Sequence, residues 1–226
     1  MNTRTPLLVS LLLLAVVGCV TAWGWMAIPA GVQIAVHWGI NGQPNGWTSK
    51  NVGLLLTPIL AVGLVGMFWL IPRIEPRRRN LGASRPFYVT GWLGSLALLV
   101  VVQVVTVLYA KGVELNVGNI ATVSVAVLLL AMGNFLGKTR ANFFAGVRTP
   151  WSLSSDFAWE KSNRAAGRLF VITGLATLAA LLAGGMKAAG IVLIAGLLVA
   201  ATVSVVLSYV YWRRDPHKHT VDMTPE

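Results

Sequence analysis

The sequence predicts an all-α integral membrane protein: a six-helix transmembrane bundle with both termini in the cytoplasm, a structured outer loop and an interfacial inner helix. Of its 226 residues, 56% are apolar and only 11% are charged, whereas about a quarter of an ordinary soluble domain is charged. Long uncharged runs also separate the charged residues. Such a chain cannot build a water-facing surface, so we expect lipid to be its solvent.

The uncharged runs define the predicted spans. A helix rises about 1.5 Å per residue and needs roughly 20 residues to cross about 30 Å of hydrocarbon. Five of the six runs are 18 to 25 residues long, and each matches one span. The first run, between Arg4 and Lys50, is longer and indicates a span followed by an uncharged loop. The predicted spans are 6–27, 53–72, 89–110, 117–136, 168–185 and 189–212. Because these runs are continuously apolar rather than alternating, strands are not expected within them.

Lysine and arginine predict the orientation. Fifteen of these residues would fall on one side of the membrane and three on the other, and basic residues in short loops favour the cytoplasmic side. The expected inner residues are Arg4, Arg73, Arg77, Arg78, Arg79, Arg85, Lys138, Arg140, Arg148, Lys161, Arg164, Arg168, Arg213, Arg214 and Lys218; the outer ones are Lys50, Lys111 and Lys187. Topology and membrane lipids then explain the net charge of +11, and no direct nucleic-acid partner is expected.

The loops divide the chain into regions. Two loops are richer in detail than the others: an uncharged outer loop, and an inner loop between the fourth and fifth spans. The predicted organisation is an N-terminal two-span domain (1–72) with outer loop 28–52, a basic cytoplasmic connector (73–88), a four-span domain (89–213) with inner loop 137–168, and a polar tail (214–226).

The outer loop has turn chemistry and interfacial aromatics. Pro-Asn-Gly at 44–46 favours a turn. Trp38 and Trp47 flank it, and tryptophan favours the membrane interface. His37 lacks neighbouring Cys, Asp or Glu residues, so a structural or interfacial role is favoured over metal binding.

The inner loop is predicted to contain a short helix that runs into the fifth span. Thr149 followed by Pro150 is typical of a helix N-cap, so this one helix starts there or a few residues later, at Ser154 or Ser155. Nearby aromatic residues would anchor this helix among lipid headgroups. It is either a lipid-anchored connector or a binding surface for a cytoplasmic partner.

Apart from Arg168 at the first position of span 168–185, the predicted spans contain no Asp, Glu, Lys, Arg or His, which argues against an ion-coupled transporter or a proton pump. Gly133 and Gly137 form a small-xxx-small pair that allows close helix approach. No paired carboxylates, His cluster or nucleophile with a base appears, so we expect no enzyme, no catalytic residue, no metal and no cofactor.

Val16 to Cys19 resembles a lipoprotein processing site, but the apolar run continues beyond it, which favours a retained span.

The inner loop contains an ordered string made of Asn134, Gly137, Lys138, Asn142, Phe143, Gly146, Arg148, Thr149, Pro150 and Trp151. This string resembles the signature of the SdpI family of bacterial immunity proteins. That signature has an Asn, a Gly-Lys, an Asn followed by an aromatic residue, and then Gly-Ile-Arg-Thr-Pro-Trp. The inner helix of the family commonly has Thr-His-Arg, whereas this chain has Ser-Asn-Arg at 162–164, which removes the basis for a histidine-dependent role.

The outer loop resembles a small N-terminal membrane domain, of unknown function, that often precedes the SdpI region. The residues that carry this resemblance are Pro29, His37, Trp38, Asn41, Gly42, Pro44, Gly46, Trp47 and Lys50. Where that domain commonly has Pro-Asp-Gly, this chain has Asn45, so a possible acidic ligand is absent.

The resemblance implies a protein of the bacterial cytoplasmic (inner) membrane that protects its producer from a secreted, membrane-active toxic peptide. For the best-known member type it also implies a receptor that sequesters a cytoplasmic transcriptional repressor. By this analogy the outer loop binds the peptide through His37, Trp38, Asn41, Gly42, Pro44 and Trp47. The inner loop binds the regulator through Lys138, Arg140, Asn142, Arg148, Thr149, Pro150 and Trp151.

Two other functions stay open at this point. A transporter or exporter of a peptide or small amphiphile predicts a polar cavity near the midplane, lined by Gln103, Asn119 and Asn134. A structural partner of a membrane complex predicts stable association with one abundant membrane protein.

Overall fold

The computed structural model describes residues 1–218, so residues 219–226 of the predicted polar tail lie outside the described residues. Five of its helices are long and apolar enough to cross a membrane: α1, α2, α4, α5 and α7. The elements, in chain order, are α1 (Arg4–Ala27), β1 (Gln33–Trp38), β2 (Pro44–Ser49), α2 (Lys50–Ile74), α3 (Arg78–Ala83), α4 (Arg85–Ala110), α5 (Val117–Leu136), α6 (Pro150–Leu153) and α7 (Asp156–Arg214).

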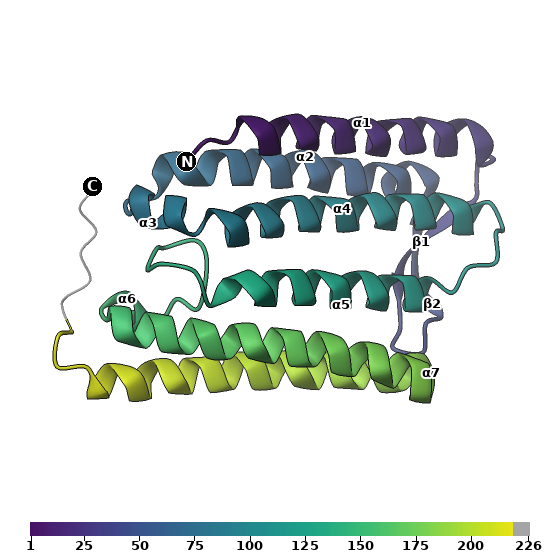
Figure 1. The fold of residues 1–226 in the computed structure, drawn as a ribbon. Helices are drawn as coiled ribbons and strands as arrows, with labels where there is room; N and C mark the ends of the chain where they lie inside the picture. Colours follow the sequence, from purple (N-terminus) through teal and green to yellow (C-terminus); the bar gives the residue numbers. More distant parts are fainter. Residues whose placement is uncertain (219–226) are drawn as a thin grey trace.

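Helix α7 contains two helical arms. Its 59 residues would be roughly 90 Å long as one straight helix, about three times the hydrocarbon thickness. The chain instead reverses at Gly185, whose φ of 72° and ψ of −168° are not helical. The arms lie side by side (Figure 1) and contain the predicted spans 168–185 and 189–212. The prediction of a helical membrane protein is confirmed. The six membrane crossings and the cytoplasmic location of both termini stay predictions.

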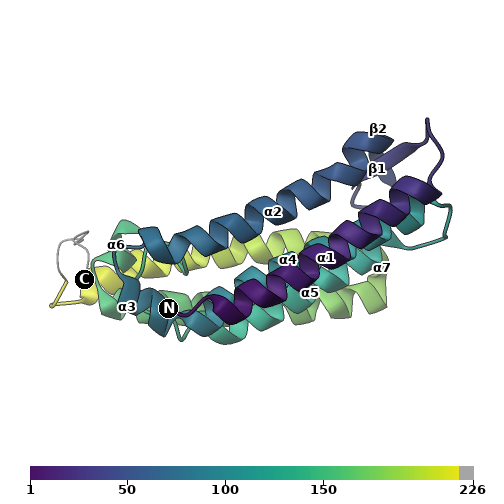
Figure 2. The ribbon, with the colours of Figure 1, turned by 90° about the horizontal axis from the view of Figure 1, so that it is seen from above.

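The long helices run along one common direction and leave the molecule with two different ends (Figure 1, Figure 2). We call the end that carries β1 and β2 the hairpin end. The opposite end, with the N-terminus, α3, α6 and both termini of α7, is the basic end, because its segments carry the fifteen basic residues expected inside. Helices α1, α2 and α4 pack together, α5 packs mainly on α7, and α4 also contacts α5.

The outer loop corrects the all-α prediction, since it forms an antiparallel β-hairpin. Its register pairs Gln33 with Ser49 at the open end and Trp38 with Pro44 near the tip. The turn also differs from the prediction: it occupies 39–43, where Gly39 and Gly42 each donate a backbone hydrogen bond and Gly42 has a φ of 77°. The predicted turn at 44–46 is therefore wrong, and these residues belong to β2.

Packing against the bundle explains this choice of turn. Two Asn-Gly pairs, at 41–42 and at 45–46, have turn chemistry. Ile34 of β1 is fully buried, in a cluster with Ile28, Leu54 and Val107. Because a shift of one residue would turn Ile34 away from that cluster, burial selects the register and with it the 41–42 turn.

Small residues bring α5 and α7 close together, as the sequence predicts. A Cβ atom added to Gly133 would lie 2.7 Å from the carbonyl oxygen of Gly167, and one added to Gly167 would lie 2.6 Å from that of Gly133. Only glycine allows the two backbones this approach.

Candidate recognition surfaces

The hairpin is held firmly on the bundle. The Lys50 ammonium donates hydrogen bonds to the carbonyl oxygens of Trp25 and Ile28, at 2.7 and 2.6 Å. These carbonyls end helix α1 and have no partner within it, so Lys50 caps that helix. Gly53 at the start of α2 leaves room for Ile34, because a Cβ there would lie 2.5 Å from the isoleucine side chain.

The predicted outer residues face in different directions. His37 is exposed and its Nδ1 atom is hydrogen-bonded to the side-chain oxygen of Asn45, while Trp47 is 50% exposed. Trp38 instead turns toward the bundle and packs edge-on against Tyr109, with ring centroids 6.0 Å apart. Its buried indole nitrogen has no hydrogen-bond partner among residues 1–218. His37 and Trp47 are therefore accessible, and Trp38 is a packing residue.

The tip of the hairpin borders a cavity of about 440 Å³. Asn41, Gly42 and Pro44 line it from the hairpin, and Glu114 and Asn116 line it from the loop before α5. Gly42 also lies close to Gly118 of α5, since a Cβ added to Gly118 would lie 2.9 Å from the Cα atom of Gly42. Three predicted outer residues thus line one cavity beside the loop that precedes α5.

The inner loop folds around Asn142, which is fully buried. Its amide nitrogen donates to the carbonyl oxygens of Arg140 and Ala145, at 2.7 and 3.0 Å. Its side-chain oxygen accepts from the backbone N–H groups of Phe144 and Ala145, at 3.0 and 2.7 Å. Asn142 therefore shapes the loop and is not available to a partner.

A second buried asparagine, Asn163 of α7, holds the other side of the loop. Its side-chain oxygen accepts the backbone N–H of Val147 at 2.7 Å. The indole N–H of Trp159 donates to the carbonyl oxygen of Thr139 at 3.1 Å. Gly146 passes between them with a φ of 126°, and a Cβ there would lie 2.6 Å from the Asn163 oxygen. Asn163 thus performs a structural task at the position where the family pattern has histidine.

The two alternative starts predicted for one helix are both used, because the segment forms two helices, α6 and α7. Thr149 forms a capping box with Ser152 at the start of α6, and its hydroxyl lies 2.8 Å from that of Ser208 on the second arm of α7. Ser155 caps α7 by accepting the backbone N–H of Ala158 at 3.0 Å, and its hydroxyl donates to Asp215. The hydrogen bond from Ser155, and then that from the backbone of His217, hold the pKa of the Asp215 carboxyl below its ordinary value.

Glu75 is a buried carboxylate that the sequence analysis missed. Only 1% of it is exposed, and its two oxygens accept the backbone N–H groups of Arg77 and Phe143, at 2.8 and 3.0 Å. The Arg77 guanidinium donates to the carbonyl oxygen of Leu153 at 3.1 Å, and the Asn80 amide donates to that of Ala141 at 2.8 Å. The basic connector is therefore bound to the inner loop. The sequence did contain a signal for this anchor, namely one acidic residue, Glu75, just before the three arginines at 77–79.

The inner residues that remain accessible are mostly cationic. Lys138, Arg140, Arg148 and Pro150 are exposed, whereas Trp151 is half-buried against a tyrosine of α7. One guanidinium nitrogen of Arg148 donates to the carbonyl oxygen of Phe143 at 2.8 Å. Arg148 also lines two cavities, of about 550 and 300 Å³, whose other lining residues are mostly apolar.

The cavity expected of an exporter is not assembled in the described part of the chain. Gln103 is fully buried, and its amide donates to Thr21 on α1 at 2.8 Å and to the Leu54 carbonyl oxygen on α2 at 3.2 Å. Asn134 lines a cavity at the basic end, and Asn119 lies near the opposite end of α5. The three residues do not share a site.

Two family models match the chain in the order that the sequence predicts. Residues 138–208 match the SdpI/YfhL protein family, and residues 11–62 match a domain of unknown function, DUF1648. The C-terminal part of this chain is therefore similar to the SdpI family. The Immunity protein SdpI of Bacillus subtilis (strain 168) is 25% identical over 182 residues, which cover 80% of this chain and 84% of that protein. No solved structure matches. The chain is a multi-pass membrane protein, and its similarity to the SdpI family supports a membrane immunity function.

Proposed function

We propose that this chain is a non-enzymatic immunity protein of the bacterial cytoplasmic membrane that protects against a secreted, membrane-active toxic peptide. The relative named Immunity protein SdpI supports this proposal, because the similarity extends over 84% of its length. The structural observation that carries it is the hairpin end, where accessible side chains and a polar cavity adjoin on one anchored element.

The hairpin end suits an amphipathic peptide. Trp47 offers an exposed aromatic ring, and His37 a polar one, outside the bundle. The adjoining cavity offers the Asn41 amide and the Glu114 carboxylate for polar or cationic groups. Because the hairpin is anchored before binding, little conformational entropy is lost on association.

The basic end suits an acidic partner in the cytoplasm. Arg148 is the first contact residue we propose there, since a guanidinium can bind a carboxylate through two parallel hydrogen bonds. Lys138 and Arg140 are exposed on the same inner loop and add positive charge. In this proposal a transcriptional repressor is held at these side chains, while Asn142 and Thr149 keep the loop in shape.

Survival of a sensitive bacterium tests the proposal. Cells that express the chain are challenged with a secreted membrane-active peptide of the type that SdpI-family proteins counter, beside cells with an empty vector. We expect the wild type to protect, and His37→Ala and Trp47→Ala to protect less at equal protein level. Val113→Ala, an exposed apolar substitution at the same end, is the matched control. Equal killing with and without the wild-type chain would contradict the proposal.

A further inference from the structure

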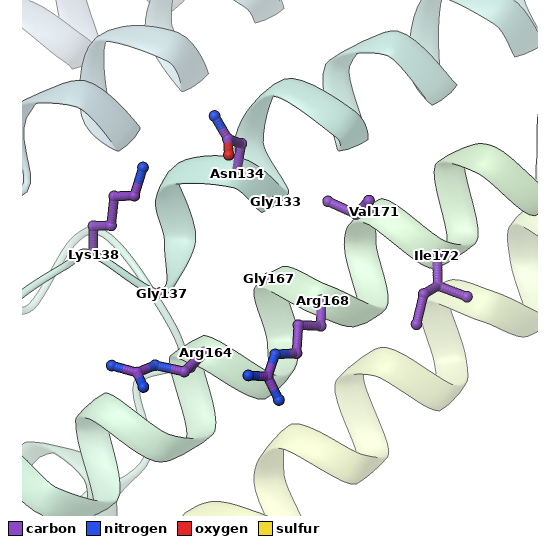
Figure 3. A pocket seen from close by; sticks show the side chains of 9 residues that line it. All are labelled: Gly133, Asn134, Gly137, Lys138, Arg164, Gly167, Arg168, Val171 and Ile172. Carbon is purple, nitrogen blue, oxygen red and sulfur yellow. The ribbon is translucent and has the colours of Figure 1, made fainter.

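A cavity of about 560 Å³ lies at the basic end, between the end of α5 and the first arm of α7 (Figure 3). Its floor is the close contact of Gly133 and Gly167. Because glycine carries no side chain, the two backbones leave a hollow that larger residues would fill. The residues around the hollow include Asn134, Gly137, Lys138, Arg164, Arg168, Val171 and Ile172.

The rim of this cavity is positively charged. Lys138, Arg164 and Arg168 are exposed, and the only acidic side chain within salt-bridge distance of any of them, in the described chain, is Glu160, 2.7 Å from Arg164. Arg168 makes no hydrogen bond or ion pair among residues 1–218. Three cations against one carboxylate leave an excess of positive charge that fits an anionic group.

The rim is charged on one side and apolar on the other. Arg164 and Arg168 are one helical turn apart on α7, and Val171 and Ile172 follow one turn later along the same arm, farther from the basic end. Ile172 is 60% exposed. Figure 3 shows the arginine and lysine side chains spread around the glycine contact, while Val171 and Ile172 project beyond it.

This order of groups matches a membrane phospholipid. Cations at the end of a transmembrane helix face the headgroup region, and the next turn of the helix faces acyl chains. A soluble phosphate ion would use the cations alone and gain nothing from the exposed isoleucine. We propose that the cavity binds the headgroup of an anionic phospholipid, with its phosphate at Arg164 and Arg168 and an acyl chain along Ile172. This site is independent of the proposed immunity function.

The test measures which lipids the full chain retains. The protein is released from nanodiscs of equal parts phosphatidylglycerol and phosphatidylcholine, and the bound lipids are counted by native mass spectrometry. We expect the wild type to retain phosphatidylglycerol preferentially. An Arg164→Gln/Arg168→Gln variant should lose this preference by about fivefold for each charge removed, or roughly 25-fold in all.

The control is Arg213→Gln/Arg214→Gln, which removes the same charge at the same end of the bundle, away from the cavity. It should keep the preference of the wild type. Equal retention of both lipids by the wild type would overturn the proposal, as would an unchanged preference in the Arg164/Arg168 variant. Displacement of the lipid by inorganic phosphate at equal concentration would also overturn it, because the cavity would then be a site for the free ion. The comparison of the two lipids retained by the wild-type chain tests the proposal even if the variant fails to fold.

Discussion

The two ends of this bundle are built in different ways. At the hairpin end the loop is a β-hairpin that rests on apolar packing around Ile34, with His37 and Trp47 left accessible. At the basic end the loop is irregular, and buried side chains bind its backbone: Asn142 from within, and Glu75 from the connector. A hairpin satisfies its backbone through its own ladder, whereas an irregular loop needs side-chain partners.

The difference teaches which signature residues are available for binding. Signature residues of the inner loop divide into buried ones that build it and exposed ones, such as Arg148, that can meet a partner. The hairpin needs few such builders, so more of its polar residues are exposed. Substitutions of buried inner-loop residues should therefore lower the stability of the protein. Substitutions of exposed hairpin residues should instead weaken binding and leave the stability nearly unchanged.

The largest effect is expected at Glu75. Glu75→Ala leaves the buried N–H groups of Arg77 and Phe143 without an acceptor, and each orphaned group costs about 1–3 kcal/mol. We expect the free energy of unfolding to fall by about 4 kcal/mol, measured by equilibrium unfolding in mixed micelles. Glu114→Ala, at an exposed position, should leave it nearly unchanged. Similar values for the two variants would refute the role of Glu75 as an anchor.

A paired substitution within the inner loop is the next test. Asn142→Ala should lower the free energy of unfolding by about 3 kcal/mol, because it breaks the hydrogen bonds that define the loop. Arg148→Ala should change it by less than about 1 kcal/mol, yet reduce repressor binding in a pull-down with purified repressor. If Arg148→Ala binds the repressor normally, the proposed contact is wrong.

At the hairpin end, Gly118 seats the tip. Gly118→Ala places a Cβ 2.9 Å from the Cα atom of Gly42, and overpacking of this kind costs about 1–3 kcal/mol. We expect a loss of about 2 kcal/mol together with weaker protection in the survival assay. Gly63→Ala, whose Cβ would meet no atom within 4 Å, is the control. Full protection by Gly118→Ala would show that the seating of the tip is not needed.

The smallest effect is a pH dependence at Asp215. Because hydrogen bonds lower the pKa of this carboxyl in the folded state, its stabilising contribution is present above the ordinary pKa of aspartate. The contribution is lost as the pH falls through the lowered pKa. Thermal unfolding at neutral and at acidic pH should therefore show a smaller acid-induced loss of stability for Asp215→Asn than for the wild type. Ser155→Ala, which removes the principal donor, should act in the same direction, and identical pH profiles for all three would contradict the account.

The sequence predicted the long helices closely, because span length is set by bilayer thickness and the apolar runs are uninterrupted. It also predicted close helix approach at Gly133, and it offered Thr149 and Ser155 as alternative caps of one helix, because these features depend on local chemistry. It placed the hairpin turn at 44–46 because local chemistry does not distinguish the two Asn-Gly pairs, and burial of Ile34 decides between them. Glu75 was missed, and Asn142 was assigned to partner contact. Both errors arose because the burial of these residues depends on segments far apart in the chain.

Photo-crosslinking tests the central claim most directly, namely that the hairpin end is where the peptide is recognised. A photoreactive phenylalanine analogue is placed at Trp47, or at Phe157, an exposed aromatic of the basic end that serves as the control. Cells are then exposed to the toxic peptide and irradiated. The account predicts that position 47 captures the peptide and position 157 does not. Capture at position 157 alone would contradict it.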